Sequence, residues 1–290
     1  MELNVYEDIL SFIKKFKGTS RECKRETIKQ YPDISEFTLG SIINLQWQFK
    51  MIVNHCHIRK IANQLYNRYK SAVNDKEEPG IIIRLASEVD FSPSQLAKLF
   101  LEQHYQTDED IGNSKKEIQK RFKDSTLIED RDLAFEVYLS ILEDDENGPY
   151  SDEIKRILGC EYEMKLQEYV SQIGLVYKTE QELQSKGYDK TPDIKLDTPM
   201  AVDGFIVNWI ESKASFGNEH QHKQYTRDQY QSYWNRFGPG LVIYWFSYVK
   251  TIIDPQEKRF IIRDSFPSNP TCLNPDVIPP PNYVQSFVIQ

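Results

Sequence analysis

The sequence predicts a fold in two parts, a helical N-terminal half followed by an α/β core with a central mixed sheet. Residues 1–150 contain successive segments whose apolar residues recur at helical spacing. The sequence Asn147-Gly148-Pro149 is expected to interrupt regular secondary structure, and beyond it segments typical of helices and strands alternate. The nearly continuous apolar run LVIYWFSYV, residues 241–249, is typical of a strand at the centre of a covered sheet.

These changes in pattern predict three regions. An all-helical domain is expected over residues 1–150 and an α/β domain over residues 151–265. Residues 266–290 contain six prolines, so we predict an extended or disordered tail that could serve as a docking peptide.

The helical half contains a predicted helix-turn-helix unit. Helices are expected over residues 5–17, 21–32, 35–53 and 57–73, the third capped by Ser35. In residues 81–103 a helix is followed by a short turn, with Ser92 as the N-cap of the next helix and Pro93 as its first residue. Such a unit could contact DNA through Ser94, Gln95 and Lys98 on an exposed helix face, or serve as a structural or protein-binding module.

The second half predicts a hairpin that collects polar groups at one rim. Strands are expected over residues 194–202 and 205–213, joined at the tight-turn signal Asp203-Gly204. Glu211 and Lys213 share a face because they are two residues apart on a strand. Continuous pairing from the turn would place Asp193 opposite Ala214, next to Lys213.

These groups suit hydrolysis of a phosphodiester. The carboxylates of Asp193 and Glu211 and the backbone carbonyl of Ser212 are hard oxygen ligands for Mg²⁺ or Mn²⁺. Such an ion could polarise the phosphate and lower the pKa of a bound water, while Lys213 positions that water or stabilises developing negative charge. The alternative is an ordinary sheet edge with solvated charges, because E-x-K and P-D are common.

Two helices contribute further candidates. Gln229 and Tyr233 lie one turn apart on a predicted helix over residues 220–237, although an aromatic core stripe would also explain Tyr233. A glutamate of the helix before the first strands, either Glu161 or Glu163, could be an outer metal ligand, and a solvated glutamate is the alternative.

Three strings carry a family resemblance: KGYDKTPD (186–193), WIESKASFG (209–217) and SYWNRFGPGLVIYW (232–245). They closely resemble the codanin-interacting nucleases, in the TPD-motif branch of the PD-(D/E)xK superfamily. The resemblance extends over nearly the whole chain, including the stretch around LASEVDFSPS.

The resemblance implies a restriction-endonuclease-like core behind the helix-turn-helix half. It implies metal-binding roles for Asp193 and Glu211, a catalytic role for Lys213, and a Q-x-x-x-Y element formed by Gln229 and Tyr233. Glu163 fits the first-helix glutamate better than Glu161. A complex with codanin-1 and a nuclear and cytoplasmic location are also implied. Lys190, Tyr233 and, in the helical half, Lys98 are predicted to contact the substrate.

Composition excludes some classes and leaves nucleic acid open. The net charge is −8, but the acidity is concentrated in residues 106–158, which carry 8 basic against 15 acidic residues. No apolar run approaches the ~18–20 residues of a membrane-spanning helix. The four cysteines are far apart, which indicates neither a zinc ribbon nor a disulfide framework, and the chain is expected not to be secreted.

We therefore expect a nuclease that depends on Mg²⁺ or Mn²⁺ and cuts DNA or RNA. The principal alternative is a catalytically silent adaptor in which a nuclease fold binds a protein partner or nucleic acid. A third possibility is a sequence-specific DNA-binding protein that uses Ser94, Gln95 and Lys98.

Overall fold

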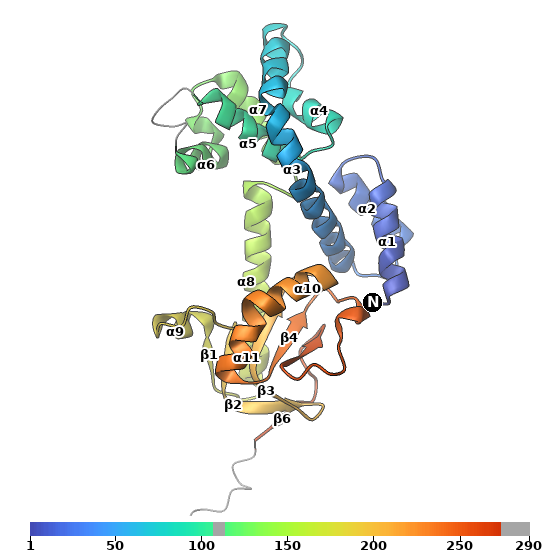
Figure 1. Ribbon diagram of the computed structural model, residues 1–290, viewed down its shortest axis with the longest axis vertical. Helices are drawn as coiled ribbons and strands as arrows, with labels where there is room; N and C mark the ends of the chain where they lie inside the picture. The colour runs from blue at the N-terminus through green and yellow to red at the C-terminus, as the bar shows by residue number, and fades with distance from the viewer. Residues whose placement is uncertain (107–113, 274–290) are drawn as a thin grey trace, which may run out of the picture. The chain divides into compact units, whose positions relative to one another are not determined.

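The computed structural model describes residues 1–106 and 114–273 (Figure 1). Contacts divide the chain into two compact units: the helical unit, Asn4–Leu158, and the sheet unit, Met1–Leu3 with the residues from Gly159 onward. The division falls inside α8 (Pro149–Gln172), which begins at the predicted break. The break at Asn147-Gly148-Pro149 therefore starts a helix that continues from one unit into the other.

Helices account for the regular structure of the helical unit. They are α1 (Leu3–Lys15), α2 (Ser20–Gln30), α3 (Glu36–Asn74), α4 (Ile81–Glu88), α5 (Pro93–His104), α6 (Lys115–Lys123) and α7 (Arg131–Glu143). The two segments predicted over 35–53 and 57–73 form one helix, α3, because residues 41–74 contain neither Gly nor Pro. Ser35 caps this helix by accepting a hydrogen bond from the Thr38 amide, as predicted.

The helix-turn-helix prediction is confirmed for the two helices and their cap. α4 and α5 are joined by a short turn, the Ser92 hydroxyl accepts from the Gln95 amide at 3.1 Å, and Pro93 opens α5. The predicted exposed face is wrong. Ser94 is fully buried, because its hydroxyl lies 2.8 Å from the Asp144 carboxylate, while Gln95 and Lys98 are half-buried.

The sheet unit contains a mixed sheet with the strand order β1-β2-β3-β4-β5, and β6 pairs with β2. The pairs within β1–β2–β3 are antiparallel, whereas β3, β4 and β5 are parallel. The strands are β1 (Tyr177–Thr179), β2 (Ile194–Val202), β3 (Phe205–Lys213), β4 (Gly240–Tyr244), β5 (Phe260–Arg263) and β6 (Thr271–Cys272). A short helix, α9 (Glu180–Ser185), follows β1.

Two helical segments cover opposite faces of this sheet. α8 packs Leu166 and Val170 into one apolar core. On the other face, α10 (Glu219–Tyr225), a π-helical turn over Thr226–Tyr230 and α11 (Gln231–Phe237) lie across the strands (Figure 1). There the Trp209 indole lies so close to Gly240 that an added Cβ would sit 2.1 Å from it, so only glycine fits where β4 begins.

The hairpin register departs from the prediction. Asp203 and Gly204 both have positive φ, as a type I′ turn requires, and Val202 pairs with Phe205 as expected. The pairing then shifts between Lys195 and Met200, so that Ile194 lies opposite Ile210. Extra residues on β2, including Pro199, which has no amide hydrogen, account for the shift. The prediction that Asp193 lies opposite Ala214 is therefore wrong, because with Ile194 opposite Ile210 the Asp193 side chain meets the Ser212 amide instead.

The C-terminal part begins with regular structure. Thr271 and Cys272 pair with Ala201 and Met200, so two residues within the predicted tail form a short strand. Residues 274–290, which include the proposed docking peptide, lie outside the described residues. Within the part of the chain that is described, no helix combines the length and the apolar character that crossing a membrane requires.

Candidate active site

Asp193, Glu211 and Lys213 meet at one end of the sheet. The Asp193 carboxylate accepts a hydrogen bond from the Ser212 amide at 2.6 Å, which fixes the start of β2 against the end of β3. The Lys213 ammonium lies 2.6 Å from a Glu211 oxygen. The strand alternation of β3 therefore places Glu211 and Lys213 on the face that α10 and α11 cover.

Three groups hold the Lys213 ammonium. Besides Glu211, it donates to the Gln229 side-chain oxygen at 3.1 Å and lies 4.6 Å from the centroid of the Tyr225 ring. Its side chain is only 16% exposed. Burial alone would lower the pKa of Lys213, but the charges of Glu211 and Asp193 outweigh it and raise that pKa. Lys213 therefore stays protonated at physiological pH.

Lys213 alone does not balance the negative charges of the two buried carboxylates, Asp193 and Glu211. Burial raises the pKa of Asp193 well above its ordinary value, the charge of Glu211 adds to this, and Lys213 opposes it. Glu211 is 2% exposed, and its Oε2 atom is buried with no hydrogen-bond partner among the described residues. A buried carboxylate oxygen without a partner is costly, and a bound cation would remove that cost.

Glu163 is the glutamate of α8 that faces this site. Burial and the charges of Glu180 and Glu211 raise its pKa, whereas Glu161 is exposed to solvent. Glu180 opens α9 and lies near Thr191, with 3.4 Å between the Thr191 hydroxyl and a Glu180 carboxylate oxygen. Its charge contributes to the raised pKa values of Glu163 and Tyr233, and its spacing in the sequence gave no signal for it.

Tyr233 lies behind the carboxylates. It is 2% exposed, and burial together with the charges of Glu211 and Asp193 raises the pKa of its hydroxyl. Its ring packs against Trp209, with 5.2 Å between ring centroids. The structure thus places Tyr233 in the aromatic core, where it supports the site from inside.

Comparisons with known proteins show which proteins this chain resembles. A family model described as "Protein of unknown function TPD sequence-motif" matches residues 129–266. Proteins named CDAN1-interacting nuclease 1 match most of the chain. The Xenopus laevis protein is 39% identical over 264 residues, which are 90% of this chain and 87% of the relative. The Homo sapiens protein is 38% identical over 266 residues, 91% of this chain and 94% of the relative.

This chain belongs to the CDAN1-interacting nuclease 1 family. The Danio rerio member is 36% identical over 267 residues, which are 91% of this chain and 88% of that protein. No solved structure matches the chain.

The other predicted site residues lie either near the candidate active site or in the helical unit. The Lys190 ammonium donates to the Asp228 carbonyl at 2.7 Å, so this exposed lysine lies beside the π-helical turn. Ser212 is fixed through its amide by Asp193 and through its hydroxyl by the Trp245 indole at 2.8 Å. Lys98 belongs to the helical unit, where its ammonium lies 5.7 Å from the centroid of the Phe122 ring.

The carboxylates fit a hard divalent cation that keeps waters. Within residues 1–106 and 114–273, no three His, Cys, Asp or Glu side chains are grouped so that they could hold a metal ion by themselves. Mg²⁺ usually takes one or two carboxylates and completes its shell with water and substrate phosphate. Asp193 and Glu211, with the unpartnered Oε2 of Glu211, match that requirement.

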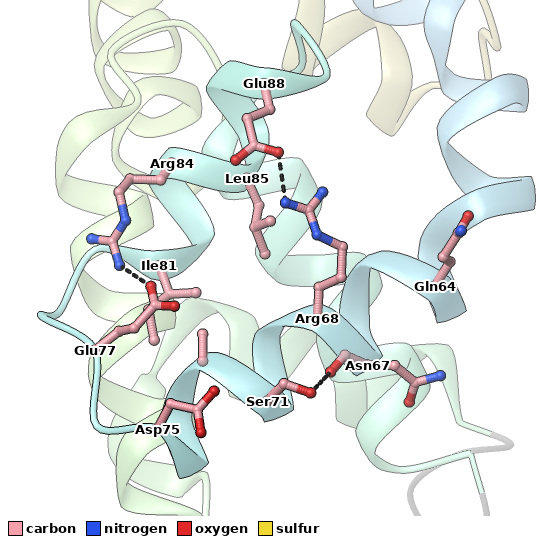
Figure 2. Close-up of a pocket in the computed structure, with 11 residues that line it drawn as sticks. Gln64, Asn67, Arg68, Ser71, Asp75, Glu77, Ile81, Arg84, Leu85 and Glu88 are labelled. Atoms are coloured by element: carbon pink, nitrogen blue, oxygen red, sulfur yellow. Dashed lines mark hydrogen bonds and ion pairs between the residues drawn. The ribbon is translucent and has the colours of Figure 1, made fainter.

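Two hollows lie away from the carboxylates. One in the helical unit, about 560 Å³ in volume, lies between α3 and α4 (Figure 2). Its arginines are engaged by its own acids, Arg68 by Glu88 and Arg84 by Glu77. The other, about 980 Å³, lies in the sheet unit beside His222 and β5. Neither includes Asp193, Glu211 or Lys213 among its lining residues.

Proposed function

We propose that this chain is a nuclease of the PD-(D/E)xK type, which uses Mg²⁺ or Mn²⁺ to hydrolyse phosphodiester bonds in DNA or RNA. The observation that carries the proposal is the pair Asp193 and Glu211 beside Lys213, with one Glu211 oxygen unpartnered. Asp193 and Glu211 would hold the cation, which would supply polarisation of the phosphate and a water of lowered pKa. The mixed sheet that presents the pair supports a restriction-endonuclease-like core.

The protein groups around the cation have separate proposed tasks. Lys213 keeps its charge because its pKa is raised, so it can stabilise negative charge that develops on the phosphate. Gln229 and Tyr225 hold the ammonium in place. The Ser212 carbonyl is proposed as a further ligand, Glu163 as an outer ligand, and Lys190 as a substrate contact.

Cleavage assays on purified full chain test this proposal. A panel of single-stranded, duplex and branched DNA and RNA is incubated with Mn²⁺, with Mg²⁺ or with a chelator. We expect metal-dependent cleavage that falls by about 10²-fold or more in Asp193→Asn and in Lys213→Ala. Lys258→Ala, a change at an exposed lysine of the sheet unit, should keep full activity. Activity that survives both site substitutions would contradict the assignment.

A silent adaptor is the second candidate, favoured by one observation. Lys213 is already engaged by Glu211, Gln229 and the Tyr225 ring, as in a structural ion pair. This candidate predicts no cleavage and no effect of divalent ions on the melting temperature.

The relatives are named for an interaction with CDAN1, so we propose codanin-1 as a partner under either candidate. We also propose a nuclear and cytoplasmic location. Both proposals come from family membership.

A further inference from the structure

A second group of aromatic side chains lies at the same end of β3 as the carboxylates, on the face that α8 covers. It consists of Tyr162 and Tyr169 of α8, Trp245 directly after β4, and Phe266. We call it the aromatic strip. Its four rings are all partly exposed, unlike the fully buried Tyr230 of the other face.

Trp245 connects the strip to the candidate active site. Its indole nitrogen donates to the Ser212 hydroxyl at 2.8 Å, and its backbone amide donates to the Lys213 carbonyl at 3.0 Å. Ser212 lies between Glu211 and Lys213, and on β3 its side chain points to the opposite face from theirs. The strip therefore begins directly across the strand from the catalytic groups.

The rings follow one another as a row. The centroids of Tyr162 and Trp245 are 5.2 Å apart, and those of Tyr169 and Trp245 are 6.4 Å apart with an interplanar angle of 20°. Tyr169 and Phe266 are nearly parallel, at 9° and 5.3 Å. The four partly exposed rings therefore form one continuous aromatic row that is longer than a single side chain.

Attachment of α8 to the sheet does not require these tyrosines to reach solvent. Leu166 and Val170 are fully buried in the core between the helix and the sheet, and Trp245 and Phe266 pack against the same core while staying partly exposed. Tyr162, Lys165 and Tyr169 lie on the neighbouring stripe of α8, at spacings of three and four residues.

Lys165 places a positive charge on the strip. Its ammonium lies 5.3 Å from the Tyr162 ring centroid and 5.5 Å from the Trp245 ring centroid. The side chain is exposed, and within the described residues it forms no ion pair. It differs in this from Lys178 and Arg236 of the same unit, which contact acids.

We propose that the aromatic strip and Lys165 bind unpaired nucleotides of single-stranded nucleic acid. Aromatic side chains stack on bases of any sequence, and a nearby cation attracts the backbone phosphates. Duplex bases are stacked on one another, so only an unpaired segment can use the rings. The inference rests on the proposed nuclease function and narrows its substrate to DNA or RNA with a single-stranded segment next to the cut.

Binding measured without cleavage tests the strip. Fluorescence anisotropy with the full chain in a chelator compares labelled oligothymidine, oligouridine and a blunt duplex of the same length. We expect tighter binding of both single strands than of the duplex. Lys165→Gln and Tyr162→Leu should each weaken single-strand binding about fivefold or more and change duplex binding less than twofold. In Lys165→Gln, the slope of the logarithm of the binding constant against the logarithm of the salt concentration should also be smaller in magnitude by about 0.7.

A matched control and a direct readout complete the test. Lys258→Gln removes one exposed positive charge from the same unit and should leave single-strand binding within twofold of the unsubstituted protein. Oligonucleotides containing 5-bromouracil should photo-cross-link to peptides that contain Tyr162 or Trp245.

Three outcomes would overturn the inference. The first is equal affinity for single strands and duplex, and the second is unchanged single-strand affinity in both Lys165→Gln and Tyr162→Leu. The third is that these two variants lose codanin-1 binding and keep oligonucleotide binding. The last would make the strip a protein-docking surface. Metal-dependent cleavage together with unchanged single-strand binding in the strip variants contradicts only this inference. Single-strand binding that depends on the strip, without any cleavage, contradicts only the proposed nuclease function.

Discussion

At the residue scale, Asp193 carries an electrostatic cost that a bound cation would remove. Burial and the Glu211 charge raise its pKa, so the charged form is disfavoured in the folded state. The folded protein therefore holds a proton more tightly than the unfolded chain, and stability falls as the pH rises above the usual carboxyl range of about 4.

This cost predicts that Asp193→Asn stabilises the metal-free protein. The amide oxygen can still accept from the Ser212 amide, while the buried negative charge is gone. We expect the free energy of unfolding to rise by roughly 1 kcal/mol at pH 7 in a chelator, and by less at pH 5. Denaturant unfolding at both pH values measures this, and a variant less stable than the unsubstituted protein at pH 7 would contradict it.

The sequence predicted the residue types of this site better than their exact positions. Glu211 and Lys213 followed from strand alternation, which depends only on local geometry. The position of Asp193 did not follow, because extra residues around Pro199 shift the register of β2. Tyr225 was missed, although it lies four residues before Gln229 and regular helical spacing would place the two on one face.

At the element scale, the π-helical turn Thr226–Tyr230 shapes the site. A π-turn adds a residue to a helix and often marks functional positions. Here Tyr225 precedes the turn and Gln229 lies within it, and both contact the Lys213 ammonium.

This arrangement makes Tyr225 a positioning residue for Lys213. A ring over a partly desolvated ammonium contributes about 1–2 kcal/mol, so Tyr225→Leu should lower kcat about tenfold with little change in KM. Tyr225→Phe keeps the ring and should keep most of the activity. Steady-state kinetics of both variants tests the idea, and equal losses in the two would show that the hydroxyl matters instead.

In the helical unit, Glu146 ties the segment before α8 to α3 through Asn44. Burial raises the pKa of Glu146 to about 7. A raised carboxyl pKa means that its contribution to stability is present at low pH and is lost as the pH rises from about 4.5 to 7.

Glu146→Gln should therefore stabilise the protein at pH 8 by roughly 2 kcal/mol and have little effect at pH 5. The glutamine can still accept a hydrogen bond from Asn44. Urea unfolding at the two pH values, compared with the unsubstituted chain, checks the sign. If Glu146→Gln lowered the free energy of unfolding equally at both pH values, Glu146 would have a packing role instead.

Elements with local start signals were predictable from the sequence. Ser35, Ser92 and the Asp203-Gly204 turn act within a few residues, and all three appear as predicted. The burial of Ser94 was not predictable, because it depends on Asp144, fifty residues away in the sequence.

At the scale of the whole molecule, the two units differ in their capacity to hold a cation. The sheet unit contains the site where Asp193 and Glu211 have too few positive partners. In the helical unit, the buried Glu136 accepts from the Gly80 and Ile82 amides at 2.6 and 3.0 Å, and Asp144 accepts from Ser94. Hydrogen bonds from α4, α5 and the residue before α4 satisfy these carboxylates, so they have little need of a bound cation.

Mn²⁺ should therefore protect only the sheet unit. An ion that binds the folded state stabilises it by about 2.7 kcal/mol when present at a hundred times its Kd. Hydrogen exchange should slow in peptides from residues 190–215 and 225–245 and remain unchanged in residues 36–104. Asp193→Asn should abolish the effect, because it removes one of two charged ligands, whereas Lys258→Gln should leave it intact. Protection that also appears in the helical unit, or that survives Asp193→Asn, would place the cation elsewhere.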